Sequence, residues 1–398
     1  MAWASETVVI VGSARTPIGK LGGRLAPVPA PQLGAVAIRA ALARSGVAPE
    51  QVDYVVMGNV LQAGVGQAPA RQAAIGAGIP AERSTALTVN MVCASGLIAV
   101  VQAAQAIQGG MAAIAVAGGM ESMDRAPHLL PALRTGVRLG HVQMVDALVH
   151  DGLWCPFANW HMGDAAEAIA RQNGITRAEQ DAYALESQRR AVAAMRAGRF
   201  DAEIAPVEME AGRERVLVAA DEGPRPDTSA EALARLRPAF QEGGTVTAGN
   251  ASLISDGAAA LVLMAESTAA RLGIPPLARI MGASAVGVEP VRLFEAPVAA
   301  IRRLLERTES ALGEYDLVEV NEAYAAQVLA NGRDLGWDWA KVNPWGGAIA
   351  LGHPIGASGA RLLVTLLHAL RANGGRRGIA ALCHGGGGAV ALAVERVA

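Results

Sequence analysis

Short apolar runs alternate along this chain with longer stretches in which apolar residues recur every three or four positions. The runs have the length of buried strands, and the longer stretches have the period of helices that pack on one side. The runs occupy residues 6–12, 53–60, 112–119, 316–323 and 378–383, and two of the helical stretches occupy residues 31–46 and 360–375. Strands that alternate with helices of this length predict βαβ units, and therefore an α/β fold with a largely parallel sheet.

The order of these elements repeats towards the two ends of the chain. An Ala-Ser-Gly sequence follows Asp53 after 41 positions (94 − 53), and another follows Asp316 after 41 positions (357 − 316). Each opens a helical stretch that leads to a glycine-rich turn, "AVAGGMES" in the first copy and "LCHGGGGA" in the second. Any two βαβ units share a strand and helix pattern, but the identical spacing of three features favours two halves with the same fold.

A segment of different character separates the two copies. Residues 124–250 contain most of the histidines and an acidic, proline-containing stretch, "AADEGPRPDTSAEALARLRPAF". Insertions of this size usually carry binding surface or assembly contacts. We therefore predict an N-terminal half (1–123 plus 251–274), an inserted segment (124–250) and a C-terminal half (275–398).

Composition and charge exclude several classes of protein. Lys and Arg total 34 and Asp and Glu total 36, so the net charge of −2 argues against nucleic acid or an anionic membrane as a partner. No apolar run approaches the roughly 20 residues of a membrane helix, and the first residues lack the features of a targeting signal. The three cysteines are too few and too far apart for a disulfide framework. We expect a soluble, cytoplasmic protein with free thiols.

Cys93 lies where an apolar run ends and a long amphipathic stretch begins, in "TVNMVCASGLIAVVQAAQ". A thiol at a helix N-terminus is close to unpaired backbone amides and to the positive end of the helix dipole, which stabilise the thiolate and lower the thiol pKa. Corners between a strand and a helix are also where α/β proteins place ligands. Cys93 is therefore a candidate nucleophile, although a lone cysteine is more often a small buried hydrophobic residue.

His353 lies just before the second Ala-Ser-Gly sequence, in "LGHPIGASGARLL". The two matching helix starts would then direct a thiol and an imidazole towards a shared centre. A lone histidine more often has a structural role than a catalytic one.

The stretch "ALCHGGGGAV" contains Cys383, His384 and four glycines. A zinc site requires several Cys or His at loop spacing, and phosphate and dinucleotide loops require a Lys or a third Gly that this stretch lacks. Two interpretations of the stretch remain. In one, Cys383 is a second thiol at a strand end, and the glycine amides are free to bind an oxyanion. In the other, the glycines form a turn that only permits close packing. Neighbouring strand residues point to opposite sides, so His384 should point away from a cleft that Cys383 faces.

Taken together, the motifs resemble the thiolase family, closest to its short-chain acetyl-CoA acetyltransferase branch. The resemblance runs from the first strand to the last and keeps the order of the motifs, which are "VNMVCASG", "GGMES", "HMGDAAEAIARQ", "LRPAF", "GGTVTAGNAS", "VNEAYAAQ", "GGAIALGHPIGASGARLL" and "CHGGGG". It implies duplicated βαβ halves in a layered αβαβα arrangement, with an inserted loop domain that covers coenzyme A. The implied reaction interconverts two acetyl-CoA with acetoacetyl-CoA and CoA, by ping-pong Claisen chemistry through an acyl-cysteine.

The resemblance also implies a role for each catalytic position. Cys93 would take the acyl group as a thioester, and His353 would activate its thiol. Cys383 would move the proton to or from the second substrate. Asn321 would hold a water that, with the His353 ring, stabilises the enolate-like oxygen. The backbone amides of Cys93 and Gly385 would form a second oxyanion hole.

The resemblance assigns the binding of coenzyme A to the inserted segment and its neighbours. The expected binding positions are Leu153, His161, Met162, Arg225, Ala248, Ser252 and Tyr324. Met162 would narrow the acyl pocket, as in the short-chain enzymes. We expect CoA thioesters as substrates, no permanently bound cofactor, no metal, and a homodimer or homotetramer without nucleic acid or membrane partners.

Four features depart from the usual pattern of the family. They are Tyr324 in place of the commoner Phe, Trp345 before the His353 loop, "LFEAP" at residues 293–297, and His384. They do not change the expected reaction class, but they leave open which acyl groups the enzyme accepts. The alternatives are a broader-range 3-ketoacyl-CoA thiolase, a ketoacyl synthase with one Cys and two His, and a non-catalytic CoA-binding homologue. Asn321 and Cys383 argue against the synthase.

Overall fold

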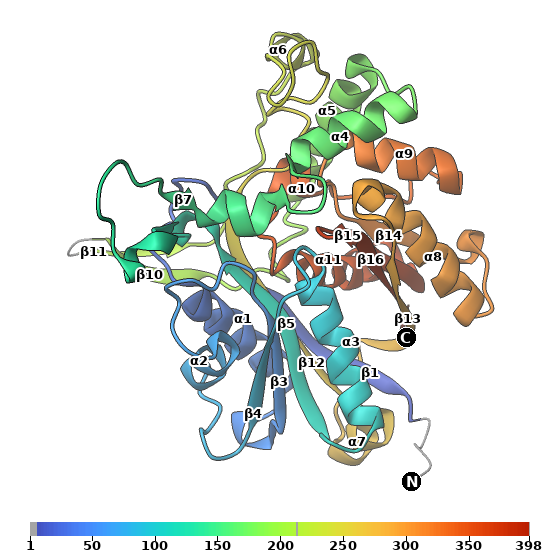
Figure 1. Cartoon of the computed structure of the whole chain (residues 1–398). Coiled ribbons are helices and arrows are strands. Elements are labelled where there is room, and N and C mark those ends of the chain that lie inside the picture. The colour runs from blue at the N-terminus through green and yellow to red at the C-terminus, as the bar shows by residue number, and fades with distance from the viewer. Residues whose placement is uncertain (1–5, 212–213, 398) are drawn as a thin grey trace.

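A ten-stranded sheet forms the centre of the computed structural model, which describes residues 6–211 and 214–397 (Figure 1). Nine strands lie side by side, and the short strand β2 (Gly19–Lys20) pairs with β12 beside them. Their order is β14 (Leu317–Val320), β15 (Arg377–His384), β16 (Gly388–Arg396), β13 (Ala278–Gly287), β1 (Val8–Arg15), β12 (Ser255–Ala265), β5 (Ile114–Ser122), β3 (Tyr54–Gly58) and β4 (Thr85–Val89). Every residue of β1, β5 and β12 is buried, so these strands form the core.

The sheet is mixed, so the prediction of a largely parallel sheet is wrong. Parallel pairing joins β3 to β4 and β5, and joins β14 to β15. The other neighbours in the sheet are antiparallel. β15 turns back into β16 through a glycine hairpin, where Gly386 and Gly387 have φ of +88° and +91°. β12 enters the sheet from the inserted segment and runs antiparallel to both of its main neighbours, β1 and β5.

Helices and the two halves of the sheet form five layers (Figure 1). The halves meet where β1 pairs with β13, through two residue pairs. Helices α3 (Ser95–Gln108) and α11 (Ser358–Asn373) pack against each other between the halves and contact strands of both. Helices α1 (Ala30–Ser45) and α2 (Pro69–Gly76) cover the outer face of the first half, and α8 (Ala296–Arg307) covers that of the second. The α/β class and the αβαβα layering are as predicted.

The element boundaries repeat the spacing that the sequence contains. From the first residue of β3 to the first residue of α3 is 41 positions (95 − 54), and from β14 to α11 is also 41 (358 − 317). In the first half β4 pairs with β3 within this interval. In the second half a single parallel bridge between Val318 and Val342 takes the place of that strand. The second copy has therefore kept the spacing but lost most of one strand.

Two glycines allow the first turns of α3 and α11 to interlock. A Cβ on Gly96 of α3 would lie 2.8 Å from the Ala360 nitrogen of α11, and a Cβ on Gly359 of α11 would lie 2.5 Å from the Leu97 nitrogen of α3. Such distances are too short for a real Cβ, so each helix uses the space left by the other's glycine. These are the glycines of the two Ala-Ser-Gly sequences.

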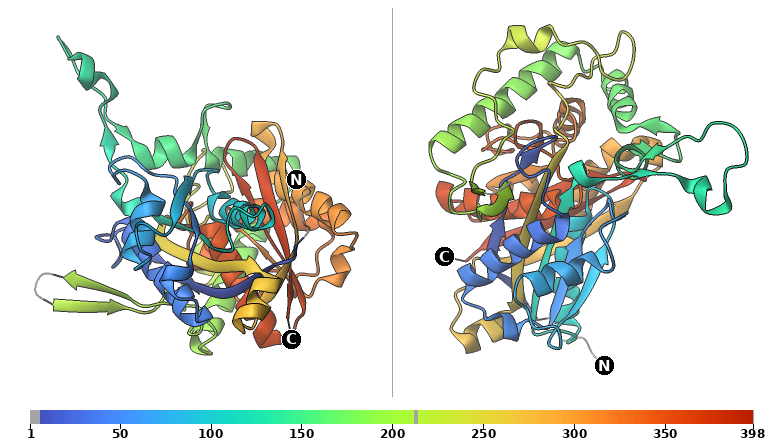
Figure 2. Two further views of the ribbon diagram at one scale, coloured as in Figure 1. Left: turned by 90° about the horizontal axis from the view of Figure 1, so that it is seen from below. Right: turned by 90° about the vertical axis from the view of Figure 1, so that its left-hand side faces the viewer.

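The inserted segment adds hairpins and helices outside the main sheet. Two parts of this segment project from the rest of the molecule (Figure 2). These parts are the β10–β11 hairpin and the stretch that contains β6 and β7. The segment's described elements are β6 (His128–Leu129), β7 (Val145–Asp146), a π-helical turn (Leu148–Leu153), β8 (Trp154–Cys155), β9 (Trp160–His161), α4 (Met162–Gln172), α5 (Arg177–Arg196), β10 (Val207–Ala211), β11 (Glu214–Val218) and α6 (Ala230–Ala234). Among the described residues, every helix is too short or too polar to cross a lipid bilayer.

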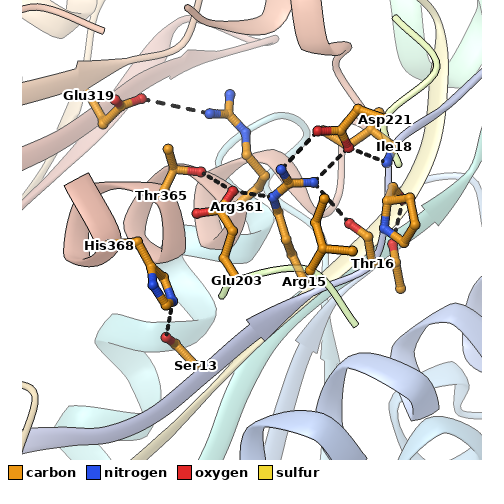
Figure 3. Close-up of polar contacts among 12 residues, drawn as sticks. Ser13, Arg15, Thr16, Ile18, Glu203, Asp221, Glu319, Arg361, Thr365 and His368 are labelled. Carbon is orange, nitrogen blue, oxygen red and sulfur yellow. Dashed lines mark hydrogen bonds and ion pairs between the residues drawn. The ribbon is translucent and has the colours of Figure 1, made fainter. Parts of the chain in front are cut away.

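One buried arginine fastens the inserted segment to the sheet (Figure 3). Arg15, the last residue of β1, is fully buried, and its Nε donates to Glu203 at 2.5 Å. Its two terminal nitrogens donate to the Asp221 carboxylate at 2.7 and 2.9 Å. Glu203 and Asp221 flank the β10–β11 hairpin in sequence, so one guanidinium holds both ends of it. Such a pairing is costly to break, because it would leave a buried charge without a partner.

The interlocked helices predict the effect of a single added methyl group. Gly359→Ala should lower the free energy of unfolding by about 1–3 kcal/mol, because the new Cβ forces α3 and α11 apart. The matched control is Gly313→Ala, where no atom lies within 4 Å of the added Cβ, and this change should stay below about 1 kcal/mol. Urea unfolding of the two variants and the wild type measures both values. Equal stability of the two variants would contradict the interlock.

Candidate active site

Cys93 lies in the tight turn between β4 and α3. The Ser95 hydroxyl accepts a hydrogen bond from the Met91 amide at 2.8 Å and donates to the Val92 carbonyl at 2.6 Å. Val92 has a φ of +45°, an uncommon conformation for a β-branched residue. The serine of the first Ala-Ser-Gly sequence therefore holds a strained turn that presents the thiol. Sequence reasoning gave this serine no role.

Burial raises the pKa of the Cys93 thiol to about 11, so the expectation of a lowered pKa is wrong. The amides of Gly385 and of Cys93 itself face the sulfur and lower the pKa, but desolvation of the sulfur outweighs them, and the nearby Glu121 carboxylate adds to the rise. The residue as a whole is only partly buried, whereas its sulfur is enclosed. Below about pH 11 the thiol therefore keeps its proton in the substrate-free protein.

His353 is held in one tautomer by the serine of the second Ala-Ser-Gly sequence. The Ser358 hydroxyl lies 2.6 Å from His353 Nδ1 and donates its proton to the Pro354 carbonyl at 2.9 Å. Ser358 must therefore accept from Nδ1–H, which leaves Nε2 without a proton. Burial, and secondarily the Arg361 charge, lower the pKa of His353 to about 3, so the ring is neutral at physiological pH.

Asn321 faces the free nitrogen of this ring. Its Nδ2 lies 3.3 Å from His353 Nε2, and its buried Oδ1 has no hydrogen-bond partner in the described residues. The next residue, Glu322, fixes the turn, because its carboxylate accepts four hydrogen bonds. The donors are the Tyr183 and Ser187 hydroxyls, the Asn343 side-chain amide and the Ile349 backbone amide of α10 (Ala348–Leu351). Asn321 therefore offers an unused acceptor from a rigid position.

Glu121 of β5 fixes the loop that carries His353 to the first half. Its carboxylate accepts from the Gly356 amide at 2.8 Å, and from the Asn59 side chain and the Val60 and Leu61 amides at 2.7 to 3.1 Å. The Gly356 carbonyl lies so close to Gly58 and Gly119 that a Cβ on either would approach it to 2.7 or 2.0 Å. Burial raises the pKa of Glu121 to about 7, and the four donors oppose that rise. Glu121 lies in the "GGMES" motif, but the sequence did not predict a role for it.

Cys383 lies near the end of β15, two residues before Gly385, whose backbone amide faces the Cys93 sulfur. Only 2% of the residue is exposed, and burial together with the charge of a Cys93 thiolate raises the pKa of Cys383 well above its ordinary value. The next residue, His384, donates from Nδ1 to the Gly385 carbonyl at 2.8 Å. Its ring lies over Gly388, where a Cβ would approach Nε2 to 2.4 Å. The His384 ring therefore packs on its own hairpin.

A cavity of about 420 Å³ lies beside these groups, between the two halves and the inserted segment. Six of the expected binding positions line it together with His353, namely Leu153, His161, Arg225, Ala248, Ser252 and Tyr324. Met162 does not line it, but packs against the apolar cluster that contains Tyr324 and Cys383. A second cavity of about 410 Å³ lies along α5, shares Arg225 with the first, and contains no Cys or His.

The cavity wall also contains residues that sequence reasoning did not single out. They include Phe240, Leu253 and Ile355. The His161 ring stacks on Phe240 with centroids 4.8 Å apart, and His161 Nδ1 accepts from the Gly163 amide at the start of α4. Burial lowers the pKa of His161, so this ring is neutral. Phe240 ends the quoted motif "LRPAF", which was the only sequence signal for it.

Two of the unusual residues belong to the packed interior. Trp345 is 7% exposed and meets the Phe200 ring edge to face, with centroids 5.7 Å apart. In the "LFEAP" sequence, Leu293 and Phe294 are buried, and Phe294 packs on Tyr324 with centroids 5.5 Å apart. Trp345 does not line the cavity, whereas Phe294 packs on Tyr324, which does.

Comparison with known proteins covers nearly the whole chain. Family models described as the thiolase N-terminal and C-terminal domains match residues 8–267 and 274–396. A probable acetyl-CoA acetyltransferase of Escherichia coli K12 is 54% identical over 98% of this chain and 99% of its own length. An acetyl-CoA acetyltransferase of Cupriavidus necator is 53% identical over the same shares. The crystal structure of the Bacillus anthracis acetyl-CoA acetyltransferase matches with a TM-score of 0.97, at 43% identity and full coverage of both chains.

The raised pKa of Cys93 predicts how the free protein reacts with iodoacetamide. Because only the thiolate is alkylated, the rate at Cys93 should rise about tenfold per pH unit from pH 7 to 10 without levelling off. Peptide mapping by mass spectrometry separates Cys93 from Cys155 and Cys383. A plateau below pH 9 would mean that the thiolate already exists in the substrate-free protein, and would contradict the raised pKa.

Proposed function

This chain belongs to the thiolase family, and we propose that it is an acetyl-CoA C-acetyltransferase that interconverts two acetyl-CoA with acetoacetyl-CoA and CoA. The observation that carries the proposal is a cavity lined by the neutral imidazole of His353, with Cys93 packed beside its lining residues Leu153 and Ile355 and Cys383 in one cluster with Tyr324. The names of relatives that are about 50% identical over the full chain support the acetyl substrate. The residue roles below belong to the same proposal.

In the first half-reaction Cys93 takes an acetyl group from acetyl-CoA. The unprotonated Nε2 of His353 accepts the thiol proton as Sγ attacks the thioester carbon, the carbon–sulfur bond to CoA breaks, and the proton passes to the CoA sulfur. The amides of Cys93 and Gly385, which already face the sulfur, are placed to donate to the developing oxyanion. Because the free thiol has a high pKa, its proton leaves only as the substrate arrives.

In the second half-reaction the Cys383 thiol first passes its proton to His353 Nε2, and the resulting thiolate removes a proton from the methyl carbon of a second acetyl-CoA. The unused Asn321 Oδ1 is available to hold a water, and this water and the newly protonated His353 Nε2 donate hydrogen bonds to the enolate oxygen. The enolate carbon attacks the acetyl group on Cys93, a carbon–carbon bond forms, and the bond from the acetyl carbon to Sγ breaks. Cys93 leaves as a thiolate that takes its proton from His353 Nε2. The products are acetoacetyl-CoA and the restored thiols.

The proposal also includes the cellular compartment, the substrates and the oligomeric state. The reaction uses two reduced thiols, which fits the reducing cytoplasm. All three cysteines are free in the described residues. CoA thioesters are the substrates, the six cavity-lining positions named above bind them, and the working form is a homodimer or homotetramer. The parts of the chain are the two thiolase halves and the inserted loop domain with the boundaries given in the sequence analysis.

The His384 contacts weigh against a ketoacyl synthase. That chemistry requires two histidines at the nucleophile, whereas His384 is bonded to the Gly385 carbonyl and packed on Gly388.

The two thiols have separable roles, which mutation distinguishes. Cys93→Ala should abolish labelling of the protein by acetyl-CoA, because no acyl-enzyme forms. Cys383→Ala should still become acetylated but should lose condensation by about 10²–10⁴-fold, the usual size of a general-base contribution. Intact-protein mass spectrometry reads the first half-reaction, and formation of acetoacetyl-CoA reads the whole cycle.

Cys155→Ala is the matched control, since Cys155 is 1% exposed and does not line the cavity. It should retain both activities. Acetylation that persists in Cys93→Ala would overturn the proposed nucleophile. An equal loss of both half-reactions in Cys383→Ala would overturn the role of the second thiol.

A further inference from the structure

Four consecutive glycines, residues 385–388, connect the end of β15 to the start of β16. Gly386 and Gly387 have φ of +88° and +91°, which glycine adopts without strain. The same freedom gives a glycine turn many conformations of similar energy, unless contacts with other residues select one of them. The position of Gly385, whose amide faces the Cys93 sulfur, therefore depends on such contacts.

Different contacts hold the two ends of this turn. At the far end, the Gly387 carbonyl accepts from the Val288 amide at 3.0 Å, and a Cβ on Gly387 would lie 2.6 Å from the Val288 carbonyl oxygen. At the near end, His384 Nδ1 donates to the Gly385 carbonyl at 2.8 Å. A carbonyl oxygen can only accept, so Nδ1 carries the proton of this ring. The side chain of His384 therefore selects the conformation of Gly385.

The His384 ring is itself held in place by the hairpin. His384 pairs with Gly388 across the two strands, and a Cβ on Gly388 would lie 2.4 Å from Nε2 and 2.8 Å from Cε1 of the ring. The ring therefore fills the space that a side chain at residue 388 would need. Burial lowers the pKa of His384, and the bond to the Gly385 carbonyl opposes this change. A packed, neutral ring of this kind presents its Nδ1 proton in one direction.

Gly385 also packs against the turn that presents Cys93. A Cβ on Gly385 would lie 3.4 Å from Val92 Cγ1, which is an ordinary contact distance. Val92 directly precedes Cys93, and both residues pack against the apolar cluster that contains Ile355 of the cavity wall. A change in the conformation of Gly385 would therefore alter the direction of its amide relative to the Cys93 sulfur.

We infer that His384 is a positioning residue, whose bond to the Gly385 carbonyl aims the Gly385 amide at the oxyanion of the Cys93 reaction. When Cys93 Sγ bonds to the thioester carbon, the π electrons of the carbonyl move onto its oxygen, and they return when the bond to the CoA sulfur breaks. An amide aimed at this oxygen stabilises a charge that is absent from the bound substrate, so it raises the rate and not the affinity. His384 itself transfers no proton. This inference rests on the proposed function, because it requires the acyl-cysteine.

Two substitutions of nearly the same shape test the inference, because an Asn side chain has an N–H donor where the histidine has Nδ1 and a Leu side chain has none. The rate constant for acetylation of Cys93 is measured by rapid quench and intact-protein mass spectrometry. His384→Leu should lower it about 10–100-fold at saturating acetyl-CoA, since a misdirected amide loses part of the roughly 10²–10³-fold that one oxyanion donor supplies. The half-saturating concentration of acetyl-CoA should stay unchanged. His384→Asn should retain most of the rate.

His384→Ala lacks the donor without adding bulk, so it should be as slow as His384→Leu, and urea unfolding checks that all three variants fold. Wild-type rates in both His384→Leu and His384→Ala would overturn the inference. An equal loss in His384→Asn would also overturn it, because the ring itself or a proton transfer by it would then matter. So would a rise in the half-saturating concentration at an unchanged rate constant. If acetyl-CoA labels the wild type, the proposed function stands in each of these cases, and if it does not, the proposed function fails.

Discussion

The interlock between the first turns of α3 and α11 is the constraint on which the active site depends. Gly96 and Gly359 let the two helices approach to a distance that no other residue type permits. Cys93 and His353 lie two and five residues before these helices (95 − 93 and 358 − 353), so the same contact sets the distance between thiol and imidazole. The serines of the two Ala-Ser-Gly sequences then perform matching tasks, one for the Cys93 turn and one for the His353 tautomer.

The cover of the cavity depends on a second buried contact, which also ends at α11. Glu203 of the inserted segment binds Arg15 of β1 and accepts a hydrogen bond from Thr365 of α11 at 3.3 Å (Figure 3). Asp221, at the other end of the β10–β11 hairpin, binds the same guanidinium and the Ile18 amide. The inserted segment is therefore fixed both to β1 and to α11, the helix that follows the His353 loop.

The sequence was sufficient for the fold class and for the packing of the two matching helices α3 and α11, because a spacing of 41 residues repeats whatever the rest of the chain does. It was not sufficient for strand direction, since the continuous apolar run of β12 packs equally well in either orientation. The Cys93 pKa was wrong because desolvation comes from segments distant in sequence, whereas the helix start is local. The role of Glu121 was not predicted for the same reason. Three of its four hydrogen-bond donors come from residues about 60 positions away in sequence, and the fourth comes from the other half of the chain.

Hydrogen bonding divides the polar groups around the cavity into two kinds. Glu121 and Glu322 each accept four hydrogen bonds, so neither has an oxygen left for a ligand, and both fix backbone turns. Asn321 Oδ1 and Trp160 Nε1 have no partner among the described residues, although both atoms are enclosed. Buried polar groups are normally satisfied, so the unsatisfied ones mark where a ligand completes the structure. The enzyme thus combines a fully bonded support with a few open groups, and the energy that burial costs those groups is recovered only when an acyl thioester occupies the site.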